Sequence, residues 1–227
     1  MKTVGILGGM GPEATILLMQ KVFDAVPDAR DDADHIPLIV HQNPQVPSRI
    51  KALIEGTGED PGAVLGNMAQ DLEKAGASAL AMPCNTAHHY APAVEAASTL
   101  PFLNMLELTA DHLAQAGAKS VGMLASPATR LTGVFKAPFA ARGMHPVTLP
   151  DDDALLEVIR AVKAGKPAHE TGPELRMIAQ ALLDQGADHL LVACTELSLL
   201  TNSLPTGAAW SDSLDCLVSG IVRFARS

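Results

Sequence analysis

Short apolar runs alternate along the chain with longer stretches in which apolar residues recur at helical spacing. Residues 3–7 form the first run, which ends in glycines, and Pro12 then opens a helical stretch that continues to Val26. Residues 36–40 form a second run that leads into a proline-bounded segment, and residues 77–82 form a third. This alternation predicts strands, glycine turns and helices in succession.

A further helix is predicted between the second and third strands. Asp60 and Pro61 make an N-cap and first-turn pair, and Gly76 stands where a C-cap glycine belongs. The apolar positions between them follow a helical face: Val64, Leu65, Met68, Ala69 and Leu72.

The order of helix, glycine, strand and cysteine recurs later in the chain. Cys84 and Cys194 are 110 residues apart (194 − 84), and the same offset relates Leu72 to Leu182 and Gly76 to Gly186. An offset of 117 relates residues 3–7 to residues 120–124. The chain is therefore predicted to contain two related α/β units with parallel sheets.

The two repeated cysteines follow predicted strands at their carboxyl ends, where parallel α/β sheets bind ligands. If the two units face each other, Cys84 and Cys194 would approach a shared cleft from opposite sides. Two thiols that flank one carbon can take a proton from one face and deliver a proton to the other, which inverts a stereocentre. Cys216 has no counterpart in the repeat and is expected in the core.

Composition narrows the function classes. The net charge of −9, the lack of basic runs and the scarcity of aromatic residues argue against nucleic acid as a partner. Three widely spaced cysteines without a C-x-x-C pair indicate neither disulfides nor zinc, and reduced thiols suit a cytoplasmic protein. A signal peptide and a membrane span are not expected.

Other motifs permit more than one interpretation. The glycines around Met10 fit a relaxed dinucleotide fingerprint, but no acidic residue ends the second strand, so a loop that holds a carboxylate is favoured. Arg49 is expected in the proline-bounded loop after the second strand, and Lys163 at the end of a helix. Taken alone, each is typical of a solvated surface cation. Adjacent His88 and His89 would face different ways on a helix, so no metal site is predicted.

These motifs together resemble the cofactor-independent aspartate/glutamate racemases, and in particular their aspartate racemase branch. The resemblance covers essentially the whole chain. It is carried by five motifs in order: Gly8-Gly9-Met10-Gly11-Pro12-x-Ala14-Thr15, Asn43-Pro44-Gln45-x-Pro47-x-Arg49, Met82-Pro83-Cys84-Asn85-Thr86-Ala87-His88, Val162-Lys163-Ala164-Gly165 and Ala193-Cys194-Thr195-Glu196.

The resemblance implies two Rossmann-like domains, 1–99 plus 207–227 and 100–206, with the active site in the cleft between them. It also implies a homodimer and racemisation without pyridoxal phosphate or another cofactor. Cys84 and Cys194 would be the acid/base thiols, while Arg49 and Lys163 would hold substrate carboxylates. The remaining residues expected to line the substrate are Met10, Asn85, Thr86, Thr129, Thr195 and Glu196.

Aspartate is the substrate that these residues favour. Glutamate racemases usually begin with an Asp-Ser pair in the first loop and carry histidine after the second Cys-Thr, whereas this chain has Gly9-Met10 and Glu196 there. The chain departs from many aspartate racemases at residues 125–129, where it lacks a turn rich in threonine and glycine. Three alternatives stay open: a glutamate or broad-specificity racemase, another enzyme of the superfamily, and a non-catalytic small-molecule-binding α/β protein.

Overall fold

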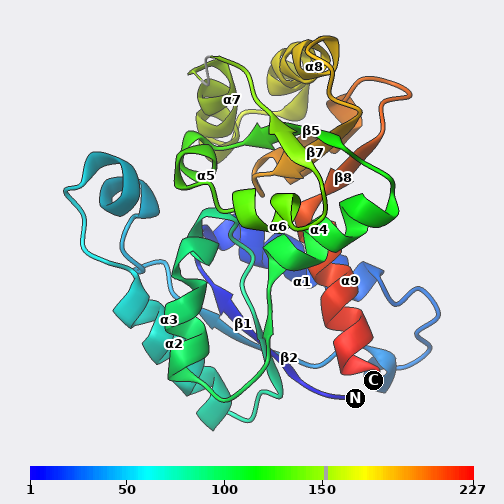
Figure 1. Cartoon of the computed structure of the whole chain (residues 1–227). Coiled ribbons are helices and arrows are strands. Elements are labelled where there is room, and N and C mark those ends of the chain that lie inside the picture. The colour runs from blue at the N-terminus through cyan, green and yellow to red at the C-terminus, as the bar shows by residue number, and fades with distance from the viewer. Residues whose placement is uncertain (151–152) are drawn as a thin grey trace. The chain divides into compact units, whose positions relative to one another are not determined.

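The computed structural model describes residues 1–150 and 153–227, and it confirms the predicted α/β class. The chain divides into two compact units. The first unit comprises Met1–Leu108 with Leu214–Ser227, and the second comprises Thr109–Ser213. Each unit is built on a sheet of four parallel strands, with helices around it (Figure 1).

The first sheet has the strand order β2-β1-β3-β4. Its strands are β1 (Val4–Gly8), β2 (Leu38–Gln42), β3 (Ala79–Ala81) and β4 (Phe102–Leu103). The α-helices of this unit are α1 (Pro12–Asp24), α2 (Gly62–Lys74), α3 (Ala91–Ala97), α4 (Met105–Gln115), which continues into the second unit, and α9 (Ser213–Ala225), whose first residue belongs to the second unit. The shorter helices are 3-10 helices at Asp32–Asp34 (η1) and Thr86–Tyr90 (η3) and a π-helix at Lys51–Glu55 (η2).

The second sheet repeats this topology as β6-β5-β7-β8. Its strands are β5 (Ser120–Ala125), β6 (His145–Val147), β7 (His189–Ala193) and β8 (Trp210–Asp212). Its helices are α5 (Pro127–Thr132), α6 (Lys136–Ala140), α7 (Asp153–Lys163), α8 (Ala168–Asp184) and the 3-10 helix η4 (Leu197–Ser203). The repeat seen in the sequence is therefore a repeat of strand order.

Both faces of the first sheet are buried, as expected for parallel strands. Successive side chains of β1 alternate between the two faces, so Ile6 joins a cluster with α1 and α9 while Leu7 joins a cluster with α2. Figure 1 shows α2 and α3 on one side of this sheet and α9 on the other. In the second unit, β7 packs against α7 and α8.

The C-terminal helix α9 completes the core of the first unit. Leu214, Leu217 and Ile221 pack in the cluster that covers one face of β1. Nζ of Lys21 lies 2.6 Å from Oδ1 of Asp215, which ties α1 to α9. This unit is therefore assembled from two segments that are distant in the sequence.

Corresponding helices end in the same way in the two units. After α2, Gly76 has a φ of +95°, and the N–H of Ala77 donates to the carbonyl of Leu72 at 3.0 Å. After α8, Gly186 has the same φ, and Ala187 donates to Leu182 at 3.1 Å. Both are Schellman ends, in which glycine adopts the left-handed conformation.

Each helix end packs tightly against a glycine of the central strand. A Cβ placed on Gly5 would lie 2.9 Å from Cβ of Ala77, and one placed on Gly122 would lie 3.0 Å from Cβ of Ala187. These separations are shorter than van der Waals contact, so only glycine fits there.

Several predicted boundaries differ from those in the structure. The second strand was expected at residues 36–40 but lies at Leu38–Gln42, because Pro37 has no N–H to donate and only its carbonyl accepts, from Val4. The third strand is shorter than the predicted residues 77–82, because Ala77 belongs to the end of α2. The first helix ends at Asp24 and not at Val26.

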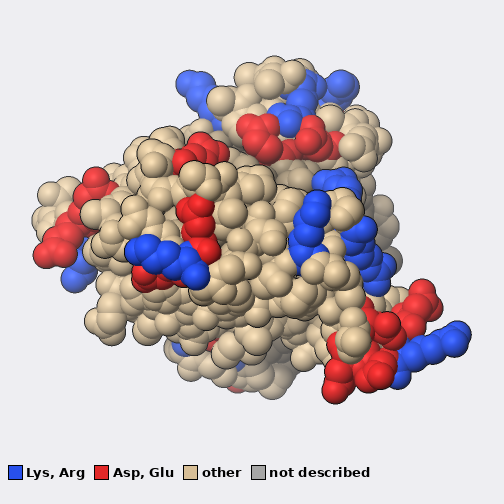
Figure 2. Space-filling view, turned by 90° about the horizontal axis from the view of Figure 1, so that it is seen from below, with Lys and Arg blue, Asp and Glu red and all other residues tan. Residues whose placement is uncertain are grey.

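The surface shown in Figure 2 carries acidic and basic side chains in small separate groups. On that face, the described residues form no continuous basic stripe. None of the helices in residues 1–150 and 153–227 is both long and apolar enough to span a membrane.

We expect Gly5→Ala and Gly122→Ala each to lower the free energy of unfolding by about 1–3 kcal/mol, because the added methyl group overpacks the contact with the helix end. Calorimetric or chemical unfolding would measure the loss. Gly62→Ala is the matched control, since the atom nearest to its added Cβ is the end of the Asp60 side chain, at 3.1 Å. Wild-type stability in Gly5→Ala would contradict this account of the packing.

Candidate active site

Both repeated cysteines lie at the carboxyl edge of a sheet. Cys194 directly follows β7, and Cys84 follows β3 after two residues, and each of these strands is third in the order of its sheet. A 3-10 helix follows each cysteine, η3 after Cys84 and η4 after Cys194. Both thiols are free and buried.

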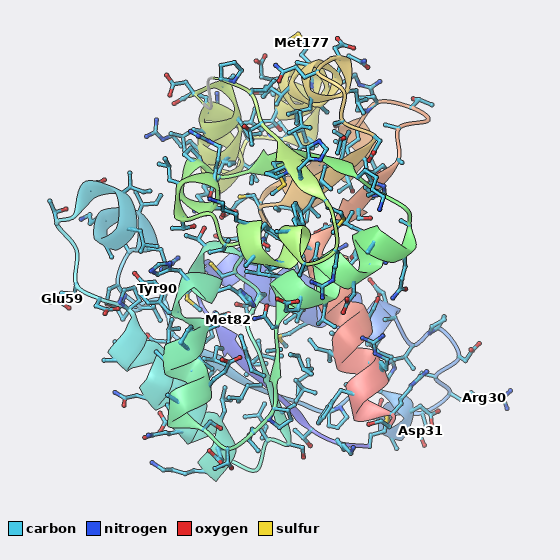
Figure 3. All side chains as sticks on the ribbon, in the orientation of Figure 1. Arg30, Asp31, Glu59, Met82, Tyr90 and Met177 are labelled. Carbon is cyan, nitrogen blue, oxygen red and sulfur yellow. The ribbon has the colours of Figure 1, made fainter. Side chains whose placement is uncertain are left out.

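In the first unit, Cys84 belongs to an apolar cluster that also contains Met10 and Val46. Met10 follows β1, and Val46 lies in the segment after β2, so the loops at the ends of three adjacent strands meet around this cysteine. Asn85 and Thr86 follow it and are also buried. Met82, two residues before the cysteine, lies in the interior of the unit, whereas Arg30 lies at its periphery (Figure 3).

The glycines after β1 allow two of these loops to approach each other closely. Gly9 has a φ of +95°, and a Cβ on it would lie 2.5 Å from the carbonyl oxygen of Asn43. The N–H of Gly9 donates to Oγ1 of Thr15 at 2.9 Å, which fixes the loop against α1. The segment that leads to Arg49 is therefore held next to the loop that contains Met10.

Arg49 was expected in an irregular loop, but it lies in a helical turn directly before the π-helix η2. Its Nη1 donates to the carbonyl of Pro47 at 3.1 Å. Burial and the nearby Asp60 raise the pKa of Tyr90, and the charge of Arg49 opposes this rise. The guanidinium group therefore lies within electrostatic range of η3, the helix that follows Cys84.

His88 connects Cys84 to the start of α4, a role that the sequence did not reveal. The N–H of Met105 donates to Nε2 at 3.1 Å, so Nδ1 carries the proton and donates to the carbonyl of Cys84 at 2.8 Å. Burial lowers the pKa of His88 to about 4. A neutral imidazole thus holds the backbone of Cys84 in place.

In the second unit, three predicted site residues form a chain of contacts. The Sγ of Cys194 donates to Oε2 of Glu196 at 3.0 Å, and Nζ of Lys163 lies 3.0 Å from Oε1 of the same carboxylate. Lys163 is the last residue of α7, as predicted, and its side chain is half-exposed. The carboxylate therefore joins the thiol to the lysine.

The charges of Glu196 and Lys163 have opposite effects on the pKa of Cys194. Burial, the charge of Glu196 and the hydrogen bond to it raise the pKa of Cys194 well above its usual range, while Lys163 opposes the rise. Burial would raise the pKa of Glu196, but Lys163 and the thiol hydrogen bond outweigh it and hold that pKa below its usual value. Cys194 is therefore a thiol next to a carboxylate.

The other two predicted residues of this unit lie at the same sheet edge. Thr195 is buried, and its Oγ1 lies 3.5 Å from Oε2 of Glu196. Thr129 is buried in α5, which follows β5, and its N–H donates to Oγ of Ser126 at 3.3 Å. Since Ala125 pairs with Ala193 across the sheet, α5 and Cys194 follow adjacent strand ends.

The repeat is broken directly after the cysteines. The 110-residue offset places Thr86 where the second unit has Glu196, so the carboxylate next to Cys194 has no counterpart in the first unit. Among residues 1–150 and 153–227, no group of three or more His, Cys, Asp or Glu side chains could hold a metal ion. Cys216 is buried in α9, as expected.

Comparison with known proteins identifies the family. The family model for Asp/Glu/hydantoin racemases matches residues 7–219. The chain belongs to the Asp/Glu/hydantoin racemase family. It is therefore an enzyme of the isomerase class.

This racemase is similar over its whole length to the aspartate racemase of Picrophilus torridus, with 30% identity, a TM-score of 0.85 and coverage of 100% of this chain and 95% of that one. The broad specificity amino-acid racemase RacX of Bacillus subtilis (strain 168) is 26% identical over 96% of each chain. A glutamate racemase from Francisella tularensis shares the fold, with 14% identity, a TM-score of 0.72 and coverage of 98% of this chain and 80% of that one.

The His88 bridge predicts how stability depends on pH. The folded racemase excludes a proton that the unfolded chain binds below a pKa of 6.5, so stability is lost as the pH falls from about 6.5 towards 4. Protonation of His88 lowers the free energy of unfolding by about 3 kcal/mol. Unfolding measured across this range should show a shallower pH dependence in His88→Gln than in the wild type.

The neighbouring exposed histidine provides the control. His89→Gln should keep the wild-type pH dependence, because its side chain does not bridge two buried backbone groups. An equal slope in His88→Gln and the wild type would contradict the assignment of a buried neutral imidazole. Titration of the imidazole resonances by NMR would test the same point directly.

Proposed function

We propose that this racemase interconverts L- and D-aspartate without pyridoxal phosphate, with Cys84 and Cys194 as its two acid/base groups. The observation that carries the proposal is the placement of one thiol at the carboxyl edge of the corresponding strand in each unit. Each unit also has a cation close to the residues that follow its cysteine, Arg49 in the first and Lys163 in the second.

The proposed reaction is a proton transfer on each face of the substrate's α-carbon. A thiolate removes the α-proton, and the electron pair of the C–H bond stays on the substrate as a carbanion stabilised by its carboxylate. The opposite thiol then donates its proton to the other face, and the configuration is inverted. One thiol and one thiolate are present before and after the reaction, so no cofactor or co-reactant is consumed.

The cations offset an electrostatic cost. Aspartate brings two carboxylates to a protein whose net charge is −9, so local positive charge is needed to bind it. Arg49 and Lys163 are proposed to hold these carboxylates, and positive charge near the α-carboxylate also favours the carbanion. Met10, Asn85, Thr86, Thr129, Thr195 and Glu196 are proposed to line the site.

The 30% identity to an aspartate racemase supports aspartate as the substrate. The similarity to a broad-specificity racemase supports the alternative of a wider range of amino acids. Measuring kcat/KM for aspartate, glutamate and neutral amino acids without added cofactor separates these possibilities. We also propose that the enzyme is a cytoplasmic homodimer.

Replacing either thiol should abolish racemisation. Because each face of the carbon needs its own proton carrier, we expect Cys84→Ser and Cys194→Ser each to lower kcat/KM at least about 10³-fold. Chiral chromatography of the products would measure the loss. Cys216→Ser is the matched control and should keep its activity, since this thiol packs in the core of the first unit.

The two possible failures of this prediction have different meanings. Full activity in either single variant would exclude the two-thiol mechanism while leaving a racemase. Absence of racemisation of any amino acid by the wild-type enzyme would exclude the proposed function.

A further inference from the structure

The contacts around Cys194 point to a residue that controls its protonation. Glu196 contacts two groups. The thiol of Cys194 lies 3.0 Å from one oxygen of its carboxylate, and the ammonium group of Lys163 lies 3.0 Å from the other. Its side chain is 16% exposed, against 56% for the lysine. A carboxylate in such a place interacts strongly with its partners because little water screens it.

Among the described residues, the other elements packed around Cys194 bring few charges to it. The neighbouring strand β5 ends in Ala125 and is followed by uncharged Ser126, and the parts of α8 and η4 in its cluster are apolar. Strand β8 on the other side carries the buried Asp212, which pairs with Val192, two residues before the cysteine. Within residues 1–150 and 153–227, Glu196 contacts the thiol of Cys194 directly and Lys163 contacts Glu196.

We propose that Glu196 is a positioning residue that keeps Cys194 in its protonated, proton-donating form, and that Lys163 weakens this hold through its ion pair with Glu196. The carboxylate accepts the S–H hydrogen bond, and a negative charge beside a thiol disfavours the thiolate. The raised pKa of Cys194 agrees with this geometry. The catalytic role of Glu196 rests on the proposed function, whereas its contacts with Cys194 and Lys163 do not depend on the substrate.

Substrate binding would then strengthen the effect. A substrate carboxylate that attracts Lys163 draws positive charge away from Glu196, so the carboxylate binds the thiol proton more firmly. Cys194 would keep its proton until a carbanion forms on the substrate. Since the first unit has Thr86 at the equivalent position, the two thiols of the resting enzyme are not equivalent.

The test measures how fast iodoacetamide alkylates each cysteine as a function of pH, with peptide mass spectrometry to separate Cys84 from Cys194. Glu196→Gln keeps the shape of the side chain and removes its charge. We expect alkylation of Cys194 to become at least about threefold faster at a given pH, since a thiol pKa lowered by about one unit gives tenfold more thiolate of lower intrinsic reactivity. The pH profile should shift downwards accordingly.

Lys163→Met removes the positive charge paired with Glu196, at a half-exposed position, and should slow the alkylation of Cys194 by a similar factor. If Glu196→Gln fails to fold, the alkylation rate in Lys163→Met still tests the proposal. The matched control is Glu157→Gln, which removes an exposed carboxylate of α7 that is paired with Arg160 and should leave the rate unchanged. An unchanged rate at Cys194 in both test variants, or an equal rise at Cys84 and Cys194, would overturn the proposal.

Exchange of the substrate's α-proton with deuterated water connects this result to catalysis. In a Cys84→Ala background Cys194 acts alone, and Glu196→Gln should move the pH profile of exchange to lower pH by about one unit or more. In a Cys194→Ala background the same change should leave the profile in place. Loss of exchange at every pH in the first background would overturn the proposal and make Glu196 a proton acceptor.

Failure of the proposed function and failure of the role of Glu196 give different results. If the wild-type enzyme racemises no amino acid, the proposed function is wrong, while the alkylation rates still decide whether Glu196 controls the thiol. If the wild-type enzyme racemises an amino acid and the alkylation rate of Cys194 does not change in the variants, only the proposed role of Glu196 is wrong.

Discussion

The close packing of a helix end against a glycine of the central strand is the constraint from which the rest of this structure follows. The end of α2 lies so near Gly5, and the end of α8 so near Gly122, that no side chain fits between them. The left-handed glycine after that helix, Gly76 or Gly186, turns the chain directly into the next strand. A cysteine follows the carboxyl end of each of these strands, directly after β7 and after two residues beyond β3, so the same packing sets where both thiols lie in their units.

The two units share this packing but differ in the residues around their cysteines. In the first unit, the neutral imidazole of His88 holds the backbone of Cys84 and leaves the surroundings of the thiol largely apolar. In the second unit, Glu196 contacts the thiol itself and Lys163 contacts Glu196. The sequence repeat relates the two cysteines to each other, but the side chains that follow them differ, and the contacts around the two cysteines differ accordingly.

The predictable part of the fold depended on local signals. Glycine at helix ends, proline at helix starts and uninterrupted apolar runs indicated the α/β class and the helix end at Lys163, because short-range geometry sets them. The helical turn at Arg49 and the shift of β2 beyond Pro37 depend on contacts made after folding. The role of His88 required knowing that Met105, seventeen residues away, faces the imidazole. The ion pair between Lys163 and Glu196 likewise joins two segments that are distant in the sequence, and no local sequence pattern predicts it.

The central claim is that two thiols act on opposite faces of one carbon, and deuterium incorporation during the first turnovers tests it most directly. L-Aspartate would be incubated with the enzyme in deuterated water, and both enantiomers would be analysed by NMR and chiral separation before equilibrium. Because the thiol that donates carries solvent deuterium while the other retains the abstracted proton, the account predicts deuterium in D-aspartate and protium in the remaining L-aspartate. Equal deuterium in both enantiomers would indicate a single base and contradict the account.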